Sequence, residues 1–377
     1  MTIQAVLDDA VAQGAMPFVV AMAGNSGGIT FEGAAGEARA GQAAGPDTVF
    51  RIFSMSKSIG ALAAMILIDR GRLTMDTPVA EVLPEWDRVQ VLEGFEGETP
   101  VTRAPKVAAT IRHLATHTVG MDYEFWDADV QRYMKATGLR TLLSGRRASL
   151  FYPLMADPGT RWSYGPGVDW LGQVVEAVDG RRIDAFCREE IFAPLGMEDT
   201  VFEPDGMEER LAQVWQRQED GGFAARKLAP PARPEIYGMG HALYSTAPDY
   251  MRFLRMVLNR GALDGVRILS EGAVAEMLAD QMRGLHVLPM RSATPATSAD
   301  FVLPPDTTHS FAFARFESDR PEGRRAGSQA WAGIANTHFW LDPASDVAAV
   351  LMTQTLPFAE PRFMAAYEEY ERAVHGR

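Results

Sequence analysis

The chain has 377 residues, 47% hydrophobic and 23% charged, which is the balance of a globular protein with a large core. Its formal net charge of −13 argues against nucleic acids and anionic membrane surfaces as partners, because both need a basic surface. With a single cysteine, Cys187, the chain forms no internal disulfide, so nothing indicates an oxidising compartment.

The first residues lack the basic segment and apolar block of a signal peptide. No apolar run approaches the roughly 18 residues that a membrane-spanning helix needs. We therefore expect a cytoplasmic protein that does not bind membranes.

The first 71 residues predict both helices and strands. Apolar residues recur at helical spacing over 3–13, and 18–23 and 29–33 read as strands joined by a glycine-rich turn. An apolar run at 49–53 leads to Ser54, a plausible helix start, and 59–70 is apolar on nearly all sides, which predicts a buried helix. Gly71 follows, where glycine commonly ends a helix.

The rest of the chain changes character twice. Residues 73–234 show helical patterns and few strand signals, and later residues predict helices at 248–258, 270–278 and 361–373 and strands at 309–316, 337–341 and 347–353. Residues 291–308 predict a long surface loop. The simplest assembly is an α+β fold in which 1–72 and 235–377 form an antiparallel sheet flanked by helices. An inserted, mostly helical domain at 73–234 would leave the active site in the cleft between them.

Ser54-Met55-Ser56-Lys57 carries the first candidate chemistry. A serine hydroxyl needs a base within hydrogen-bond reach to become a nucleophile. Residues three apart share one face of a helix, so Lys57 is expected beside Ser54. Because the following helix is buried, the Lys57 ammonium needs strong partners or a lowered pKa, and either suits a catalytic group.

Ser26 offers a competing nucleophile, because Gly24-Asn25-Ser26-Gly27-Gly28 fits the G-x-S-x-G pattern. That motif requires a helix after the serine. Here a strand pattern follows, so a hairpin turn is the better interpretation.

Two further motifs lie near predicted loops and strands. Tyr164, in Trp162-Ser163-Tyr164-Gly165-Pro166, has a phenol that can relay a proton if a lysine stabilises the phenolate. Trp331-Ala332-Gly333-Ile334 precedes a predicted strand, and its small residues allow a substrate to approach the backbone. A backbone N–H there can pair with that of Ser54 to form an oxyanion hole. For either motif alone, a packed core aromatic is the common alternative.

Together these motifs resemble the serine β-lactamases and penicillin-binding proteins, most closely class C β-lactamases and family VIII carboxylesterases. Ser54-x-x-Lys57, Tyr164-Gly165-Pro166 and Trp331-Ala332-Gly333 follow in the family's order, and the similarity extends from about residue 3 to residue 356. Four more stretches are similar: 114–121, 158–162, Gly238-Met239-Gly240 and 339–343.

The resemblance implies a role for each motif. Ser54 would attack the acyl carbonyl, Lys57 and Tyr164 would act together as general base and then acid, and the N–H groups of Ser54 and Ile334 would hold the oxyanion. An acyl-enzyme would form and be hydrolysed by water, without a metal or an organic cofactor.

Two departures from the family pattern bear on the substrate. Trp331 stands where penicillin-recognising members carry a lysine that holds the substrate carboxylate, and a neutral indole cannot replace that charge. Pro166 stands where class C enzymes have an asparagine that contacts the substrate amide. Both departures favour uncharged esters over β-lactams.

Other residues give weaker signals. His113 and His117 have the spacing of a zinc site, but Leu114 replaces the required glutamate, so a structural role is expected. His241 is a candidate for the cleft. Tyr123, Phe125 and Trp126 are core aromatics or a wall of the substrate pocket, so Tyr123 and Trp126 join Trp331, Ala332, Gly333 and Pro166 as predicted substrate-binding residues.

We therefore predict a serine carboxylesterase acting on small or short-chain esters. An acyltransferase, an amide hydrolase and a β-lactamase remain alternatives that use the same Ser54. A non-catalytic sensor could dispense with Lys57 or Tyr164, yet both are present.

Overall fold

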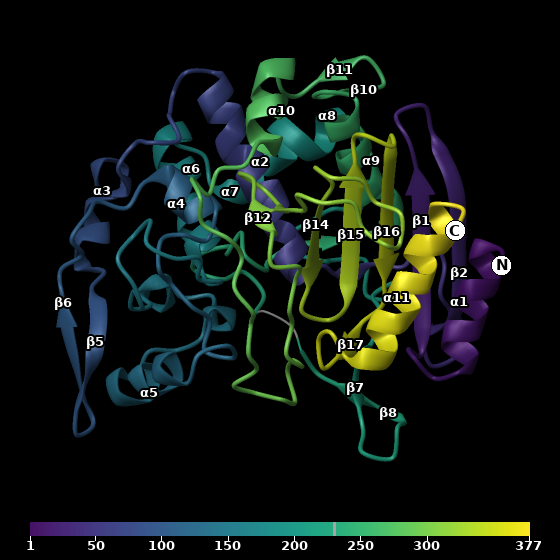
Figure 1. Cartoon of the computed structure of the whole chain (residues 1–377), viewed down its shortest axis with the longest axis horizontal. Helices are drawn as coiled ribbons and strands as arrows, with labels where there is room; N and C mark the ends of the chain where they lie inside the picture. Colours follow the sequence, from purple (N-terminus) through teal and green to yellow (C-terminus); the bar gives the residue numbers. More distant parts are fainter. Residues whose placement is uncertain (229–230) are drawn as a thin grey trace.

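Strands from both ends of the chain form one antiparallel sheet (Figure 1). In the computed structural model, which describes residues 1–228 and 231–377, its order is β12-β13-β14-β15-β16-β1-β2-β3. The strands are β1 Phe18–Gly24, β2 Ile29–Arg39, β3 Gln42–Ala43, β12 Thr308–His309, β13 Ala314–Arg315, β14 Gln329–Gly333, β15 Thr337–Asp342 and β16 Val347–Met352. β1 pairs with β16, so the two ends of the chain meet inside the sheet.

Helices cover both faces of this sheet because its central strands are apolar on both sides. Val19 and Ala21 face α1 (Ile3–Ala12) and α11 (Pro361–Val374) in a smaller core. Val20 and Met22 face the larger core, which contains α2 (Ser56–Asp69) and α9 (Ala247–Leu258). The predicted α+β architecture is confirmed, and Gly71 has the positive φ of +68° expected at a helix end.

Most of the remaining elements are short, and several lie in the part of the chain between α2 and α9. The helices are α3 Val79–Val82, α4 Ile111–Ala115, α5 Ala128–Thr137, α6 Gly167–Asp179, α7 Ile183–Cys187, α8 Ala193–Leu195 and α10 Glu271–Leu278. The strands are β4 Phe50–Arg51, β5 Val91–Glu96, β6 Thr99–Arg103, β7 Val214–Arg217, β8 Phe223–Arg226, β9 Tyr244–Ser245, β10 Ala262–Leu263, β11 Val266–Arg267 and β17 Thr355–Leu356.

Two hairpins in this middle part carry little strand signal in the sequence. In β5–β6 the register shifts between Leu92 and Gly94, which breaks the alternation that would mark a strand. The β7–β8 hairpin pairs with β17, so it joins residues 214–226 to the C-terminal part of the chain. The division into domains 1–72 with 235–377 and 73–234 stays a prediction.

The strand predicted at 309–316 is wrong in its length. Two-residue strands β12 and β13 flank a turn, in which the Ser310 N–H donates to the Phe313 carbonyl at 2.8 Å and the Phe313 N–H donates to Ser310 Oγ at 3.1 Å. A serine side chain that bonds the backbone locally competes with strand pairing. The segment 291–307 is irregular as predicted, although Ser298 within it is fully buried.

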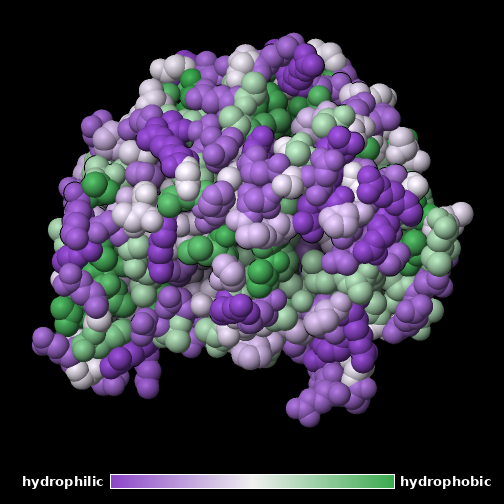
Figure 2. Space-filling model, in the orientation of Figure 1, coloured by the Kyte–Doolittle hydropathy of each residue, from purple (hydrophilic) through white to green (hydrophobic). Residues whose placement is uncertain are grey.

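The surface on the side shown in Figure 2 is mostly hydrophilic, with hydrophobic side chains gathered near its middle. In residues 1–228 and 231–377, no helix is both long and apolar enough to cross a membrane. The cytoplasmic location stays a prediction.

Candidate active site

Ser54 lies in a 3-10 turn, Phe53–Met55, that leads directly into α2. Phe53 has a φ of +41°, a conformation that a bulky residue adopts only when its surroundings enforce it. The Tyr250 hydroxyl donates to the Met55 carbonyl at 3.0 Å, and Ser56 Oγ accepts the Leu243 N–H at 3.1 Å. Neighbouring segments therefore fix the turn that presents Ser54.

Lys57 reaches back from the first turn of α2 to Ser54. Its Nζ donates to Ser54 Oγ at 3.0 Å and to the Gly240 carbonyl at 2.8 Å. The same atom lies 5.1 Å from the Tyr123 ring centre and 5.0 Å from that of Tyr164. Lys57 is buried, so the ammonium is held by these oxygens and aromatic faces in place of water.

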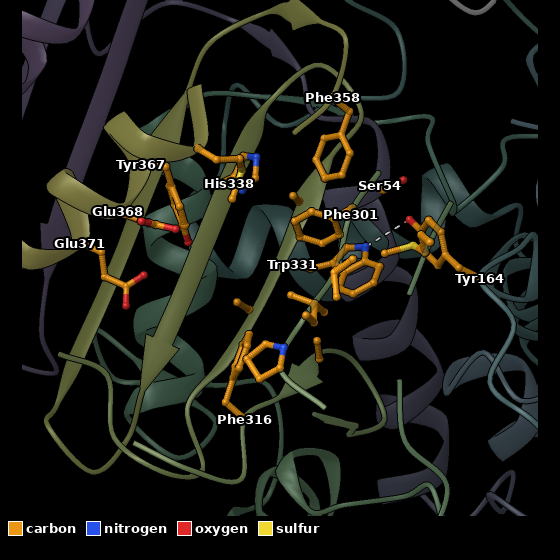
Figure 3. Close-up of a pocket in the computed structure, with 18 of the residues that line it drawn as sticks. Ser54, Tyr164, Phe301, Phe316, Trp331, His338, Phe358, Tyr367, Glu368 and Glu371 are labelled. Carbon is orange, nitrogen blue, oxygen red and sulfur yellow. Dashed lines mark hydrogen bonds between the residues drawn. The ribbon is translucent and has the colours of Figure 1, made fainter. Parts of the chain in front are cut away.

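Tyr164 lies between Lys57 and the third motif. Trp331 Nε1 donates to the Tyr164 hydroxyl at 3.2 Å, so residues 167 positions apart in the sequence share a hydrogen bond (Figure 3). The His117 ring packs against Tyr164 at 4.8 Å between ring centres, and His309 packs against Trp331 at 5.7 Å. Burial lowers the pKa of His117 well below its usual value and lowers that of His309 to about 4, so both rings are neutral at pH 7.

Gly333 brings the end of β14 against the nucleophile turn. A Cβ at this position would lie 2.4 Å from both the Ile52 carbonyl oxygen and Thr337 Oγ1, so only glycine permits the approach. Ile334, the next residue, lines the same cavities as Ser54. This is the neighbourhood that an oxyanion hole built from Ser54 and Ile334 requires.

Two cavities open at Ser54. The first, which we call the Trp331 cleft, occupies about 970 Å³ including space open to solvent. It runs from Ser54 and Tyr164 past Trp331 to Tyr367 and Glu371 of α11 (Figure 3), and Ala330 and Ala332 of β14 also line it. Aromatic and aliphatic side chains form much of its wall, among them Trp126, Phe301, Leu303, Phe316, Phe358 and Met364. Arg320, Glu322, Arg324, Glu368 and Glu371 add charged groups to the lining.

The second cavity, which we call the Tyr123 cleft, occupies about 990 Å³ on the same measure. Loops and short turns supply most of its lining, among them Tyr123, Glu124, Leu142, Leu143 and His241, and Leu356 comes from β17. The Tyr152 hydroxyl donates to Glu124 Oε2 at 2.8 Å, and burial raises the pKa of Glu124. Phe125 and Ile334 line both clefts and so mark where they meet beside Ser54.

The predicted substrate-binding residues separate into three groups. Trp331, Ala332 and Trp126 line one cleft and Tyr123 lines the other. Gly333 packs behind the cleft against Ile52, as described above. Pro166 is the N-cap residue of α6. The sequence did not single out Leu143 or Thr294, because nothing local indicates that these loops converge on Ser54.

The competing sites are placed elsewhere. Ser26 lies in the β1–β2 hairpin, where its N–H and Oγ donate to Asp346 at 3.0 and 2.7 Å, so it is a turn residue. His113 accepts the Thr110 N–H at 3.2 Å through Nδ1, capping α4. Within residues 1–228 and 231–377 there is no cluster of three or more His, Cys, Asp or Glu side chains suited to a metal ion.

Comparison with known proteins identifies the family. The beta-lactamase family profile matches residues 3–373. The chain belongs to the beta-lactamase family. It is an enzyme of the serine hydrolases and acyltransferases that share this fold.

The similar proteins include both an acyltransferase and an esterase by name. Protein Rv1367c of Mycobacterium tuberculosis is 34% identical over 63% of this chain, which spans 60% of that protein's length. Monacolin J acid methylbutanoyltransferase of Aspergillus terreus is 28% identical over 88% of this chain and 83% of its own. Lovastatin esterase of Penicillium rubens is 31% identical over 61% of this chain and 59% of its own.

A solved structure extends the similarity to the whole fold. The LovD6 mutant of simvastatin synthase from Aspergillus terreus has a TM-score of 0.84 and 26% identity, covering 99% of this chain and 96% of its own.

Proposed function

We propose that the protein is a carboxylester hydrolase that forms an acyl-enzyme on Ser54. The observation that carries this proposal is the buried Lys57 Nζ, which lies 3.0 Å from Ser54 Oγ while an aromatic wall keeps Tyr164 beside it. A lysine and a tyrosine next to a serine hydroxyl supply the base that the nucleophile needs.

The proposed reaction proceeds in two halves. Ser54 Oγ attacks the ester carbonyl carbon while its proton moves to the member of the Lys57–Tyr164 pair that is unprotonated, amine or phenolate, and the N–H groups of Ser54 and Ile334 stabilise the negative carbonyl oxygen. The intermediate expels the alcohol, which takes up that proton, and leaves the acyl group on Ser54. A water then repeats the sequence, releasing the carboxylic acid and restoring the Ser54 hydroxyl.

The position of Tyr164 suggests which cleft takes which half of the ester. The group that protonates the leaving alcohol must contact its oxygen, and Tyr164 lines the Trp331 cleft. We therefore assign the alcohol half to the Trp331 cleft and the acyl half to the Tyr123 cleft. The neutral indole of Trp331 favours uncharged esters, among them the small or short-chain ones.

Acyl transfer is a second candidate, and the two clefts favour it. When the first alcohol leaves the Trp331 cleft, a second alcohol can enter the same space and attack the acyl-enzyme. Similarity to a methylbutanoyltransferase is in keeping with this. Adding an alcohol to an ester assay and measuring the new ester against the free acid separates transfer from hydrolysis.

Replacing Ser54 with alanine tests the proposal. We expect hydrolysis of p-nitrophenyl butyrate to fall by about 10³-fold or more, because both halves of the reaction use this oxygen. Intact-protein mass spectrometry with a fluorophosphonate should show one adduct on the wild type and none on the variant. Near wild-type turnover by the variant would refute the assignment, and efficient opening of nitrocefin would overturn the preference for esters.

A further inference from the structure

A buried carboxylate lies behind Lys57 and has no part in the reaction described above. Asp169, in the first turn of α6, is fully buried. Its Oδ1 accepts the Gly240 N–H at 3.0 Å and lies 3.3 Å from His241 Nδ1, and its Oδ2 accepts the Tyr123 hydroxyl at 3.5 Å. A carboxylate is costly to bury, so this one needs a compensating reason for its position.

Asp169 holds the segment Gly238-Met239-Gly240, which packs between α2 and α6. Met239 is fully buried, and a Cβ on Gly60 of α2 or on Gly172 of α6 would come within 2.8 Å of its side chain. A Cβ on Gly238 or Gly240 would lie 2.3 Å from an Asp169 oxygen. Glycine at these places lets the helices, the segment and the carboxylate approach one another.

Gly240 connects Asp169 to the catalytic lysine through two hydrogen bonds. Its N–H donates to Asp169, and its carbonyl accepts the Lys57 ammonium at 2.8 Å. The same ammonium donates to Ser54 Oγ, and a lysine has only three donors on a flexible stem. The direction of the ammonium therefore depends on where the Gly240 carbonyl stands.

We propose that Asp169 is a positioning residue, which fixes Gly240 so that its carbonyl directs Lys57 Nζ at Ser54 Oγ. This inference rests on the proposed function of Ser54 and Lys57. Asp169 acts through Gly240 and Tyr123: it lines neither cleft itself and makes no hydrogen bond to Ser54. The acceptor oxygen is the feature that matters, so an asparagine amide should replace the carboxylate in part.

The test compares Asp169→Ala and Asp169→Asn with a matched control, Asp249→Ala. Asp249 is a second buried aspartate near a helix start, and it accepts the Asp199 N–H at 2.8 Å and the Thr200 hydroxyl at 2.9 Å. We expect D169A to lower kcat for p-nitrophenyl butyrate by about 10- to 100-fold with KM within about threefold, since small misplacements in a catalytic site have effects of this order. D169N should recover to within about fivefold of the wild type, and D249A should lose stability but keep kcat.

Activities are to be normalised to the amount of folded protein, and the stability of each variant is measured by thermal melting. If D169A matches D249A in both stability loss and kcat, the positioning role is refuted. Equal losses in D169A and D169N would also overturn it, because the acceptor oxygen would then not matter. Should D169A not fold, Gly240→Ala, which crowds the carboxylate, must lower kcat with KM retained. Failure of the wild type to hydrolyse esters would instead refute the proposed function.

Discussion

The two clefts that meet at Ser54 are built differently. The Trp331 cleft is bounded by β14 and α11, which pack on the central strands of the sheet, and by loop residues such as Trp126, Phe301 and Phe358. The Tyr123 cleft is lined mostly by loops and short turns, with Arg226 at the end of β8 and Leu356 of β17. Loops tolerate substitution better than sheet strands do. We infer that most residues beside the proposed acyl half can be substituted readily, whereas substitutions on β14 or α11, beside the proposed alcohol half, also affect the stability of the fold.

The clefts also differ in their buried ionisable groups. His117 and His309, neutral at pH 7, pack beneath the Trp331 cleft, and burial lowers the pKa of each. Glu124 lines the Tyr123 cleft, and burial raises its pKa. Lowering the pH therefore adds positive charge to the histidines under the Trp331 cleft and removes negative charge from Glu124 in the Tyr123 cleft. The two changes should have opposite effects on stability.

Among substitutions that affect only the Trp331 cleft, Tyr164→Phe should have the largest effect on kcat. Replacing Tyr164 with phenylalanine removes the hydroxyl that we assign to the leaving alcohol, and loss of a general acid or base costs about 10²- to 10⁴-fold in kcat. The effect should be smaller for p-nitrophenyl butyrate, whose leaving group is acidic, than for ethyl butyrate. An equal loss for both esters would contradict a role in protonating the alcohol.

A pair of isomeric esters tests the assignment of the two halves. Hexyl acetate and ethyl hexanoate have the same atoms but place the long chain on opposite sides of the carbonyl. Ala332→Phe narrows the Trp331 cleft and should lower kcat/KM for hexyl acetate by about tenfold, or about 1.4 kcal/mol, because its ring takes up space that the hexyl chain would fill. Leu143→Trp narrows the Tyr123 cleft and should act on ethyl hexanoate instead. The opposite pattern would reverse the assignment.

The hydrogen bond from Trp331 to Tyr164 gives a smaller effect. Trp331→Phe keeps the aromatic wall but removes the Nε1 donor, so we expect kcat to fall by about three- to tenfold. Trp162 is the matched control: its ring stacks on Tyr164 at 6.0 Å between centres, but its Nε1 has no partner in the part of the chain that the structure describes. Trp162→Phe should leave kcat within twofold, and equal losses in the two variants would point to packing alone.

The sequence predicted those parts of the molecule in which a local pattern carries the signal. The apolar run after Ser54 predicted a buried α2, and the spacing of Ser54 and Lys57 predicted their contact. The sequence misplaced the helix start, because Ser54 belongs to a 3-10 turn held by distant segments. Local spacing cannot report such support.

The Tyr123 cleft and the Asp169 contacts show the same limit. Leu142, Thr294 and Leu356 have ordinary loop surroundings in the sequence, and only the fold brings them to one cavity. Asp169 sits within a helical pattern, where an acidic residue usually faces solvent. Its burial follows from the glycines at 238 and 240, whose missing Cβ atoms give it room.

The stability of the fold should depend on pH in opposite directions through His309 and Glu124. The pKa of His309 is about 4 in the folded protein, below its unfolded value of 6.5, so the unfolded chain binds this proton more readily. The stability that the neutral ring contributes is present above pH 6.5 and is lost as the pH falls towards 4, up to about 3 kcal/mol in all. Burial raises the pKa of Glu124, so the folded protein binds this proton more readily than the unfolded chain does, and protonation of Glu124 adds to stability as the pH falls. In thermal melts between pH 7 and pH 4, His309→Gln should therefore flatten the fall in Tm, and Glu124→Gln should steepen it slightly. Parallel curves for wild type and His309→Gln would mean that the protonation of this ring is not linked to folding.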